Sequence, residues 1–131
     1  MTPFDRDTSK RLRQASLLFQ IGIFEELLAQ ESDDLDILAE LGELYTRAGE
    51  YEKGLAIDRR LVRLAPESPI AHYNLACSLA RVSRPDEAFA SLDRAVRLGY
   101  RDVAHLRRDP DLASLRGDAR FVELVRRLSQ S

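Results

Sequence analysis

Two stretches of the chain, Leu35–Ser68 and Pro69–Asp102, match each other at a shift of 34 residues. The identical pairs are Leu41 and Leu75, Arg47 and Arg81, Ala56 and Ala90, Arg60 and Arg94, Val62 and Val96, Arg63 and Arg97, and Leu64 and Leu98. A helical repeat of this length builds a stack of helix pairs with a concave face, because each pair buries its apolar side against its neighbours. This internal match restricts the fold more than any other feature.

The first of the two units predicts a pair of helices joined by a glycine turn. Its first helix has apolar residues at spacings of three, four and three, namely Leu38, Leu41, Tyr45 and Ala48. Gly49 follows, at a position where a helix end favours a residue that tolerates positive φ. The spacing predicts a second helix over Tyr51–Ala65, which Pro66 ends.

The second unit begins with its own start signal. Ser68 is a good N-cap residue, and Pro69 is favoured at the first helical position. The pattern predicts helices over Ile70–Val82 and Asp86–Leu98, with a turn between them. Two antiparallel helix pairs in tandem, joined by short turns, form a helical-repeat stack.

The segments at either end repeat less clearly. Upstream, Thr8–Ile21 and Phe24–Glu31 flank Gly22 and predict a degenerate first helix pair over 8–34. Phe24 aligns with Tyr51 of the next unit at a shift of 27, seven residues short of the 34-residue repeat. The second helix of this pair is therefore expected to be short. Two clear repeats are fewer than a stack normally needs, so the irregular ends are expected to complete the core.

Downstream, the pattern predicts short helices and a cap. Short helices are expected over Asp102–Arg108 and Asp111–Leu115, followed by a longer one over Ala119–Leu128. The last helix has an apolar stripe formed by Phe121, Leu124, Val125 and Leu128, with charged residues opposite. A stack needs an end layer with one polar face, and this helix has that form.

The two units resemble the tetratricopeptide repeat (TPR) family. The positions that carry the resemblance in the first unit are Leu41, Gly42, Tyr45, Gly49, Tyr51 and Pro66. Those in the second are Leu75, Ala76, Leu79, Ala88, Phe89 and Ala95. The resemblance implies an all-α, short right-handed superhelical stack of antiparallel helix pairs with a C-terminal capping helix. It implies a single domain over 1–131, divided into 8–34, 35–68, 69–102 and 103–131.

Small and unusual residues test this resemblance. Gly42 and Gly54, with Ala76 and Ala88 in the next unit, are expected to let neighbouring helices approach closely. Gly54 replaces the usual alanine and weakens its helix by roughly 1 kcal/mol. Asp58 replaces a large apolar residue, so it is expected either to face solvent or to pair with an arginine.

The resemblance also implies where a partner would bind. In the TPR architecture, the first helix of each pair lines a concave groove. By position, that groove would receive Ala39, Glu40, Glu43, Arg47, Ile70, Tyr73, Asn74, Cys77, Arg81 and Arg108. Tyr73 and Asn74 are the leading candidates, because tyrosine is frequent at interface hot spots and an amide can hold an extended backbone. Tyr73 could equally pack against its neighbours.

One known groove chemistry of the family is not expected here. Some TPR proteins hold a C-terminal carboxylate with Lys and Asn residues on successive first helices. Asn74 and Arg108 fit that pattern, but Ala39 and Glu43 stand where Lys and Asn would be needed. We therefore predict that the chain does not bind chaperone tails in this way.

Charge and hydropathy exclude several classes of partner. Residues 1–68 carry a net charge of −5 and residues 69–131 one of +3, which could orient a partner or reflect ordinary surface variation. The total of −2, without a basic run interleaved with aromatics, argues against nucleic acid. No segment has the roughly 20 apolar residues of a membrane span, and none reads as a signal peptide, so a cytoplasmic location is expected.

Catalytic and metal-binding candidates are few. His72 and His105 lie 33 residues apart on successive units and could share a face, or His72 could simply pack between helices. Cys77 has Arg81 at helical spacing, which could lower the pKa of its thiol, or it could be a small packing residue. With a single cysteine, no intrachain disulfide is possible. We expect no enzyme, no metal and no cofactor.

The sequence therefore favours a non-catalytic interaction module. It is expected to bind a segment of a partner protein in the concave groove and to act as an adaptor or assembly factor. The alternative is a structural protein that self-associates through an apolar edge or by stacking its acidic end on its basic end. The expected state is a monomer or a weak homodimer.

Overall fold

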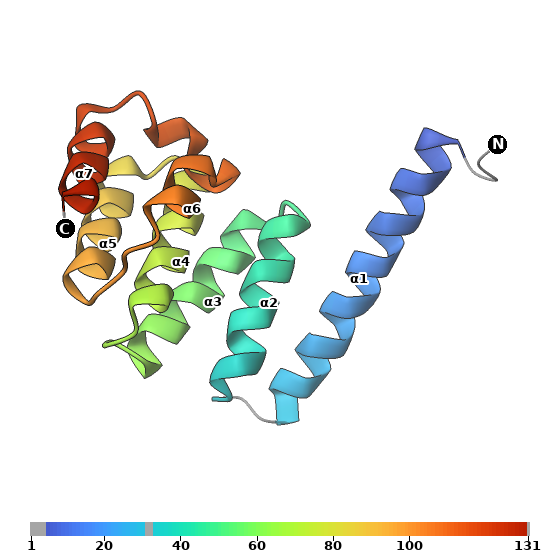
Figure 1. The fold of residues 1–131 in the computed structure, drawn as a ribbon. Coiled ribbons are helices and arrows are strands. Elements are labelled where there is room, and N and C mark those ends of the chain that lie inside the picture. Colours follow the sequence, from blue (N-terminus) through green and yellow to red (C-terminus); the bar gives the residue numbers. More distant parts are fainter. Residues whose placement is uncertain (1–4, 31–32, 131) are drawn as a thin grey trace.

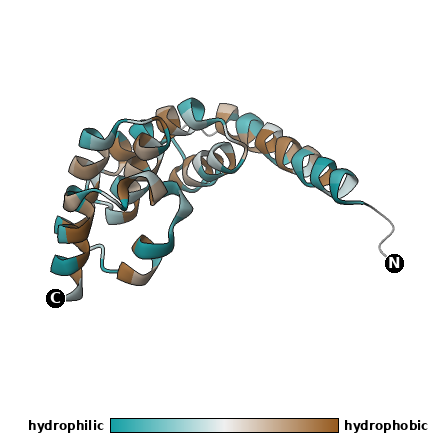
Figure 2. Cartoon of the chain, turned by 90° about the horizontal axis from the view of Figure 1, so that it is seen from above, coloured by the Kyte–Doolittle hydropathy of each residue, from teal (hydrophilic) through white to brown (hydrophobic). Residues whose placement is uncertain are grey.

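The fold is an arc of packed helices. The structure is a computed structural model that describes residues 5–30 and 33–130, and this part of the chain contains no strand. The helices are α1 (Arg6–Gln30), α2 (Leu35–Arg47), α3 (Tyr51–Leu64), α4 (Pro69–Arg81), α5 (Pro85–Arg97), α6 (Val103–Arg108), the 3-10 helix η1 (Pro110–Leu115) and α7 (Ala119–Ser129). Consecutive helices pack on one another from α1 as far as α5, α7 packs on α5 and α6, and α1 reaches away at the other end (Figure 1). The predicted fold class is confirmed, and the curvature is plain in Figure 2.

Local signals set the ends of the repeat helices. The Ser68 hydroxyl accepts a hydrogen bond from the Ala71 N–H at 3.2 Å, which confirms it as the N-cap of α4. Gly49 has a φ of 78°, in the left-handed region that favours glycine, directly after the C-cap of α2. Asp34, to which the sequence pattern assigned no role, caps α2 by accepting from the N–H groups of Asp36 and Ile37.

Two helical glycines of the first repeat, Gly42 and Gly54, lie where α2 and α3 approach each other closely. A Cβ on Gly42 would lie 2.8 Å from the Asp58 Oδ1 atom, and one on Gly54 would lie 3.1 Å from the Thr46 Oγ1 atom. The expectation that small residues allow close contact here is confirmed. Gly42→Ala would displace the Asp58 side chain, whereas Gly54 leaves slightly more room.

The main core lies around α4 and extends to the capping helix. Buried residues on α4, α5, α6, η1 and α7 form one cluster, which Leu55 joins from α3. The last helix presents the stripe predicted for a cap, in which Phe121, Leu124 and Leu128 are buried and Val125 is half-buried. The C-terminal segment thus closes the apolar end of the stack, as a terminal layer must.

The predicted helix pair over 8–34 is wrong, because a single continuous helix, α1, takes its place. Gly22 lies inside that helix, and a Cβ there would meet nothing within 4 Å, so the glycine serves no turn or close contact. A glycine inside a helix costs only about 1 kcal/mol, which packing of the flanking residues outweighs. The predicted end of the pair includes residues 31–32, which lie outside the described residues, as do 1–4 and 131.

Candidate partner-binding groove

A cavity of about 460 Å³ opens between α2, α4 and the segment that contains η1. We call it the groove. Predicted site residues that line it are Glu43, Arg47, Ile70, Tyr73, Asn74, Cys77 and Arg81. Lining residues that sequence reasoning did not place there are Gly42, Thr46, Tyr51, Asp58, His105, Asp109, Pro110 and Asp111. The third wall comes from residues 105–111, the segment in which the resemblance implied Arg108 but not the four residues that line the groove.

Three predicted site residues do not line the groove. Ala39 is half-buried and packs against the core cluster of Leu38 and Leu61. Glu40 lies beside Arg47, with 4.0 Å between its Oε1 atom and the Arg47 Nη2 atom. Arg108 is exposed at the end of α6.

Asp109 holds the third wall against α4. Its Oδ2 atom accepts a hydrogen bond from the Tyr73 hydroxyl at 2.7 Å and a weaker one from the Cys77 thiol at 3.6 Å. Its Oδ1 atom accepts from the Asp111 N–H at 3.0 Å and so caps η1. The His105 Nε2 atom lies 3.2 Å from the same Oδ2 atom. A carboxylate with this many donors is a structural anchor, because each donor would otherwise be left unsatisfied.

Tyr73 packs against its neighbours, which is one of the two roles that the sequence left open. Its side chain is only 2% exposed, and its ring stacks on that of Tyr100 with centroids 4.5 Å apart and planes 7° apart. Burial, reinforced by Cys77 and Asp109, raises the pKa of the Tyr73 hydroxyl, so the group stays a hydrogen-bond donor. The ring thus forms the floor of the groove.

The thiol of Cys77 is not activated. Burial first, and the nearby Asp109 carboxylate second, raise its pKa well above the ordinary value, so the thiol is protonated. The suggestion that Arg81 lowers this pKa is wrong. The Arg81 Nε donates instead to the Asp111 Oδ1 atom at 2.8 Å, and its guanidinium lies 5.1 Å from the centre of the Tyr51 ring.

Asp58 follows neither expectation made for it. It is buried at 4% exposure, and its Oδ2 atom accepts a 2.5 Å hydrogen bond from the Ser78 hydroxyl on α4. Burial raises the pKa of its carboxyl from 3.8 to about 6, although the Ser78 hydrogen bond acts in the opposite direction. The carboxyl therefore joins α3 to α4 beneath the groove, neither facing solvent nor paired with an arginine.

The histidines do not meet. The His72 Nε2 atom lies 2.8 Å from the Pro66 carbonyl oxygen, whereas His105 lies beside Asp109. Within the described residues, Cys77, Asp109 and Asp111 offer ligand atoms within 4.8 Å of one another. These groups are already bonded to one another and to Tyr73 and Arg81, and the thiol is protonated. These contacts form a structural network that fixes the third wall to α4.

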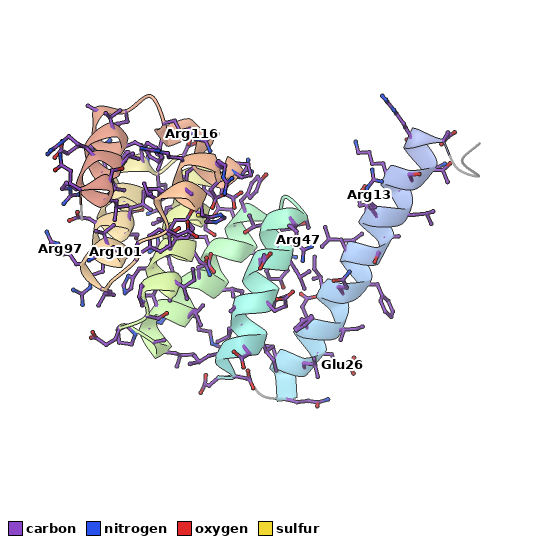
Figure 3. The ribbon with its side chains drawn as sticks, viewed as in Figure 1. Arg13, Glu26, Arg47, Arg97, Arg101 and Arg116 are labelled. Carbon is purple, nitrogen blue, oxygen red and sulfur yellow. The ribbon has the colours of Figure 1, made fainter. Side chains whose placement is uncertain are left out.

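The rim of the groove differs from its floor. Ile70 is 55% exposed, Glu43 and Arg47 are exposed, and Asn74 is half-buried. Arg47 is the last residue of α2 (Figure 3), and it lines the groove. The accessible groups of this rim thus include one apolar side chain, one amide and two opposite charges, and Arg81, His105 and Pro110 of the lining are exposed as well.

No protein-family model matches the chain. The chain is 29% identical over 126 residues to a chloroplastic protein of Arabidopsis thaliana, covering 94% of this chain and 36% of that protein. It is 34% identical over 87 residues to the TPR repeat-containing thioredoxin TTL4 of the same plant, covering 66% of this chain and 12% of that protein. It is 26% identical over 124 residues to the peroxisomal targeting signal receptor of Pichia angusta, covering 95% of this chain and 21% of that protein. The chain therefore spans about a third or less of the length of these relatives.

Two solved structures share the fold. MamA 41-end from Desulfovibrio magneticus RS-1 and a MamA RS-1 ArsTM double mutant each give a TM-score of 0.64. Each match covers 88% of this chain and 70% of the other, at 15% sequence identity. Fold and groove together define a protein built from stacked antiparallel helix pairs. The chain is a helical repeat of the TPR type, as the sequence resemblance predicted.

In the part of the chain that the structure describes, no helix is both long enough and apolar enough to cross a membrane.

Proposed function

We propose that this chain is a non-catalytic module that holds a segment of a partner protein in the groove, as an adaptor or assembly factor. TPR-type relatives support a role in protein–protein interaction. The observation that carries the proposal furthest is the groove itself. The first helices of both clear repeats and the segment around η1 line it together.

Floor and rim have separate tasks in this proposal. Tyr73 and Asp109 are bonded to each other and give the floor a fixed shape. A rigid floor lowers the cost of ordering the site when a partner binds. At the rim, Asn74 offers a donor and an acceptor to an extended backbone, and Ile70 offers apolar surface. The partner segment would therefore contact Asn74 and Ile70 more than Tyr73.

The titratable groups support a binding role over a catalytic one. Asp109 is occupied by hydrogen bonds that fix η1 to α4, and the Cys77 thiol is neutral. A nucleophile or general base must be able to change its partner during a reaction, and these groups hold the wall in place instead.

The test compares matched substitutions inside and outside the groove. The wild-type chain, immobilised, captures partners from native lysate for identification by mass spectrometry. Ile70→Asp combined with Asn74→Ala is expected to reduce capture of a specific partner about tenfold or more. Val122→Asp changes another exposed aliphatic residue, on α7, and is expected to leave capture intact.

Equal capture by the groove variant and the wild type would place the binding site elsewhere. Both variants should keep the helical circular dichroism of the wild type, because each changes an exposed or half-buried side chain. Tyr73→Ala is a poor test, since it would remove the donor that satisfies Asp109.

The self-association alternative is favoured by a separate surface. The exposed large apolar residues of α1 include Leu12, Leu18, Phe19, Ile23 and Leu27. None of them lines the groove.

A further inference from the structure

Helix α1 carries two apolar stripes on opposite sides. One packs on the neighbouring helices through Ile21, which is buried, and through the half-buried Leu17, Phe24 and Leu28. The other consists of Leu12, Phe19, Ile23 and Leu27, of which Phe19 is 71% exposed. At about 100° per residue, Leu12, Phe19 and Ile23 point about 180° away from Ile21. The second stripe is therefore a surface that the described fold does not cover.

Much of α1 also lacks support along its length. It has 25 residues and so is about 37 Å long, whereas α2 has 13 residues and is about 20 Å long. The α1 residues that pack on the core lie between Leu17 and Leu28, and the first turns extend beyond α2 (Figure 1). Residues 6–16 make up only about three turns of helix, and an isolated helix of that length is marginal in water. This segment would therefore gain stability from a further helix alongside it.

Charge divides along the same helix. Its first half carries Arg6, Lys10, Arg11 and Arg13 against the single acid Asp7. Its second half carries Glu25 and Glu26, and its last turn has no basic residue. Figure 3 shows Arg13 and Glu26 well separated along α1. Two such helices side by side repel when parallel and attract when antiparallel.

We propose that α1 is a self-complementary interface, through which two copies of this chain pair as antiparallel helices. Leu12 and Leu27 lie seven and eight residues from Phe19, on either side. A two-fold axis near Phe19 therefore brings Leu12 of one copy beside Leu27 of the other. The same axis runs the basic half of each α1 alongside the acidic half of its counterpart, as an isologous contact requires, with Glu26 nearest the outer stripe and Arg11 and Arg13 on the flanks of the helix.

This pairing places a further helix against the outer side of α1. α1 packs against α2, the first helix of the first clear repeat, as the second helix of a preceding pair would. The second copy supplies the helix that covers the outer side of α1. Because the outer stripe shares no residue with the groove, the pair carries two grooves that stay open to partners.

The first experiment measures mass in solution by sedimentation equilibrium from low to high micromolar concentration. The wild type is expected to approach twice 14.9 kDa. Phe19→Glu is expected to raise the dissociation constant about tenfold or more while leaving the helical content of the monomer unchanged. Val122→Glu alters an apolar residue that is 62% exposed on α7, and it is expected to keep the wild-type mass.

A wild type that stays at 14.9 kDa throughout, or a Phe19→Glu variant that dimerises as well as the wild type, would overturn the proposal. Sedimentation with vesicles that contain anionic lipid tests whether the outer stripe of α1 binds a membrane surface in place of a second copy. Binding of monomers to those vesicles, lost in Phe19→Glu, would assign the stripe to a membrane surface and would also overturn it.

The second experiment determines the orientation. In a Cys77→Ser background, Leu12→Cys protein and Leu27→Cys protein are mixed and oxidised. A mixed disulfide between the two proteins is expected, because antiparallel pairing brings these positions together. Disulfides that join two Leu12→Cys chains or two Leu27→Cys chains, with none joining one variant to the other, would show parallel pairing and contradict the proposal. Added salt is expected to weaken the wild-type dimer only slightly, since the outer stripe is apolar and the charged groups lie on its flanks, where water and ions screen them.

Discussion

Helices α4 and α1 occupy the centre and the edge of the same stack, and they differ sharply in burial. Eight of the 13 residues of α4 are buried, because α3, α5 and η1 all pack against it. In α1 only Ile21 of 25 residues is buried, since α2 is its main neighbour. The comparison shows that packing is concentrated where the groove is formed, whereas the edge keeps apolar surface exposed.

The polar contacts of the two helices differ in the same way. On α4, the hydroxyl groups of Tyr73 and Ser78 donate to carboxylates that are themselves buried, Asp109 and Asp58. Between α1 and α2, the Tyr45 hydroxyl donates to Glu25 at 2.7 Å, and Glu25 is exposed. Substitutions around α4 should therefore cost far more stability than substitutions on α1.

The largest effect is expected from Asp109→Ala. This change leaves the Tyr73 hydroxyl and the Cys77 thiol without their acceptor and removes the cap of η1. We expect it to lower the free energy of unfolding by about 4 kcal/mol, measured by urea denaturation. Asp118→Ala removes the equivalent cap of α7 at a more exposed site and is expected to cost about 1 kcal/mol. Similar losses in the two variants would refute a special role for Asp109.

Asp58 is expected to make stability depend on pH. Its pKa is raised in the folded chain, from 3.8 to about 6, so between these values the folded state binds more protons than the unfolded state. Stability contributed by the protonated carboxyl is therefore present at low pH and lost as the pH rises through about 6. A shift of about two units corresponds to about 3 kcal/mol.

Urea denaturation from about pH 4 to about pH 7 measures this dependence. Asp58→Asn should remove the fall in stability seen in the wild type, because the amide does not ionise. Ser78→Ala removes the hydrogen bond that lowers the Asp58 pKa, so the fall should continue to higher pH. Parallel pH profiles for wild type and Asp58→Asn would show that this carboxyl is not the cause.

The smallest of these effects is expected at the edge. Ile21→Ala should weaken the docking of α1 by about 2 kcal/mol and speed amide hydrogen exchange in α1 about thirtyfold. Leu18→Ala serves as its control, since Leu18 is 55% exposed and the change should stay within about 0.5 kcal/mol. If exchange in α4 rises as much as in α1, the two helices unfold as one unit and the contrast between them fails.

The sequence predicts the helices of the two clear repeats well because their boundaries depend on local signals. Ser68, Pro69 and Gly49 act within a few residues of themselves, so their effects can be read directly. Gly22 misleads for the same reason. A glycine commonly marks a turn, but the cost of keeping one in a helix is small enough for packing to override.

Contacts of the groove floor could not be predicted, because they join residues far apart in sequence. Ser78 meets Asp58 across 20 residues, and Tyr73 meets Asp109 across 36. Their pairing depends on how one helix pair stacks on the next. One signal was available. Tyr73, Cys77 and Arg81 form a polar stripe at four-residue spacing on α4. The carboxylates that meet this stripe, Asp109 and Asp111, lie close together in the sequence, on either side of Pro110.

The measurement that tests the proposed function most directly is site-specific photocrosslinking. A photoreactive residue in place of Ile70 places the probe at the rim of the groove, and one in place of Val122 serves as the control on α7. A partner captured by the wild-type chain is expected to crosslink from position 70 and not from position 122. Crosslinking of that partner from position 122 alone would contradict it.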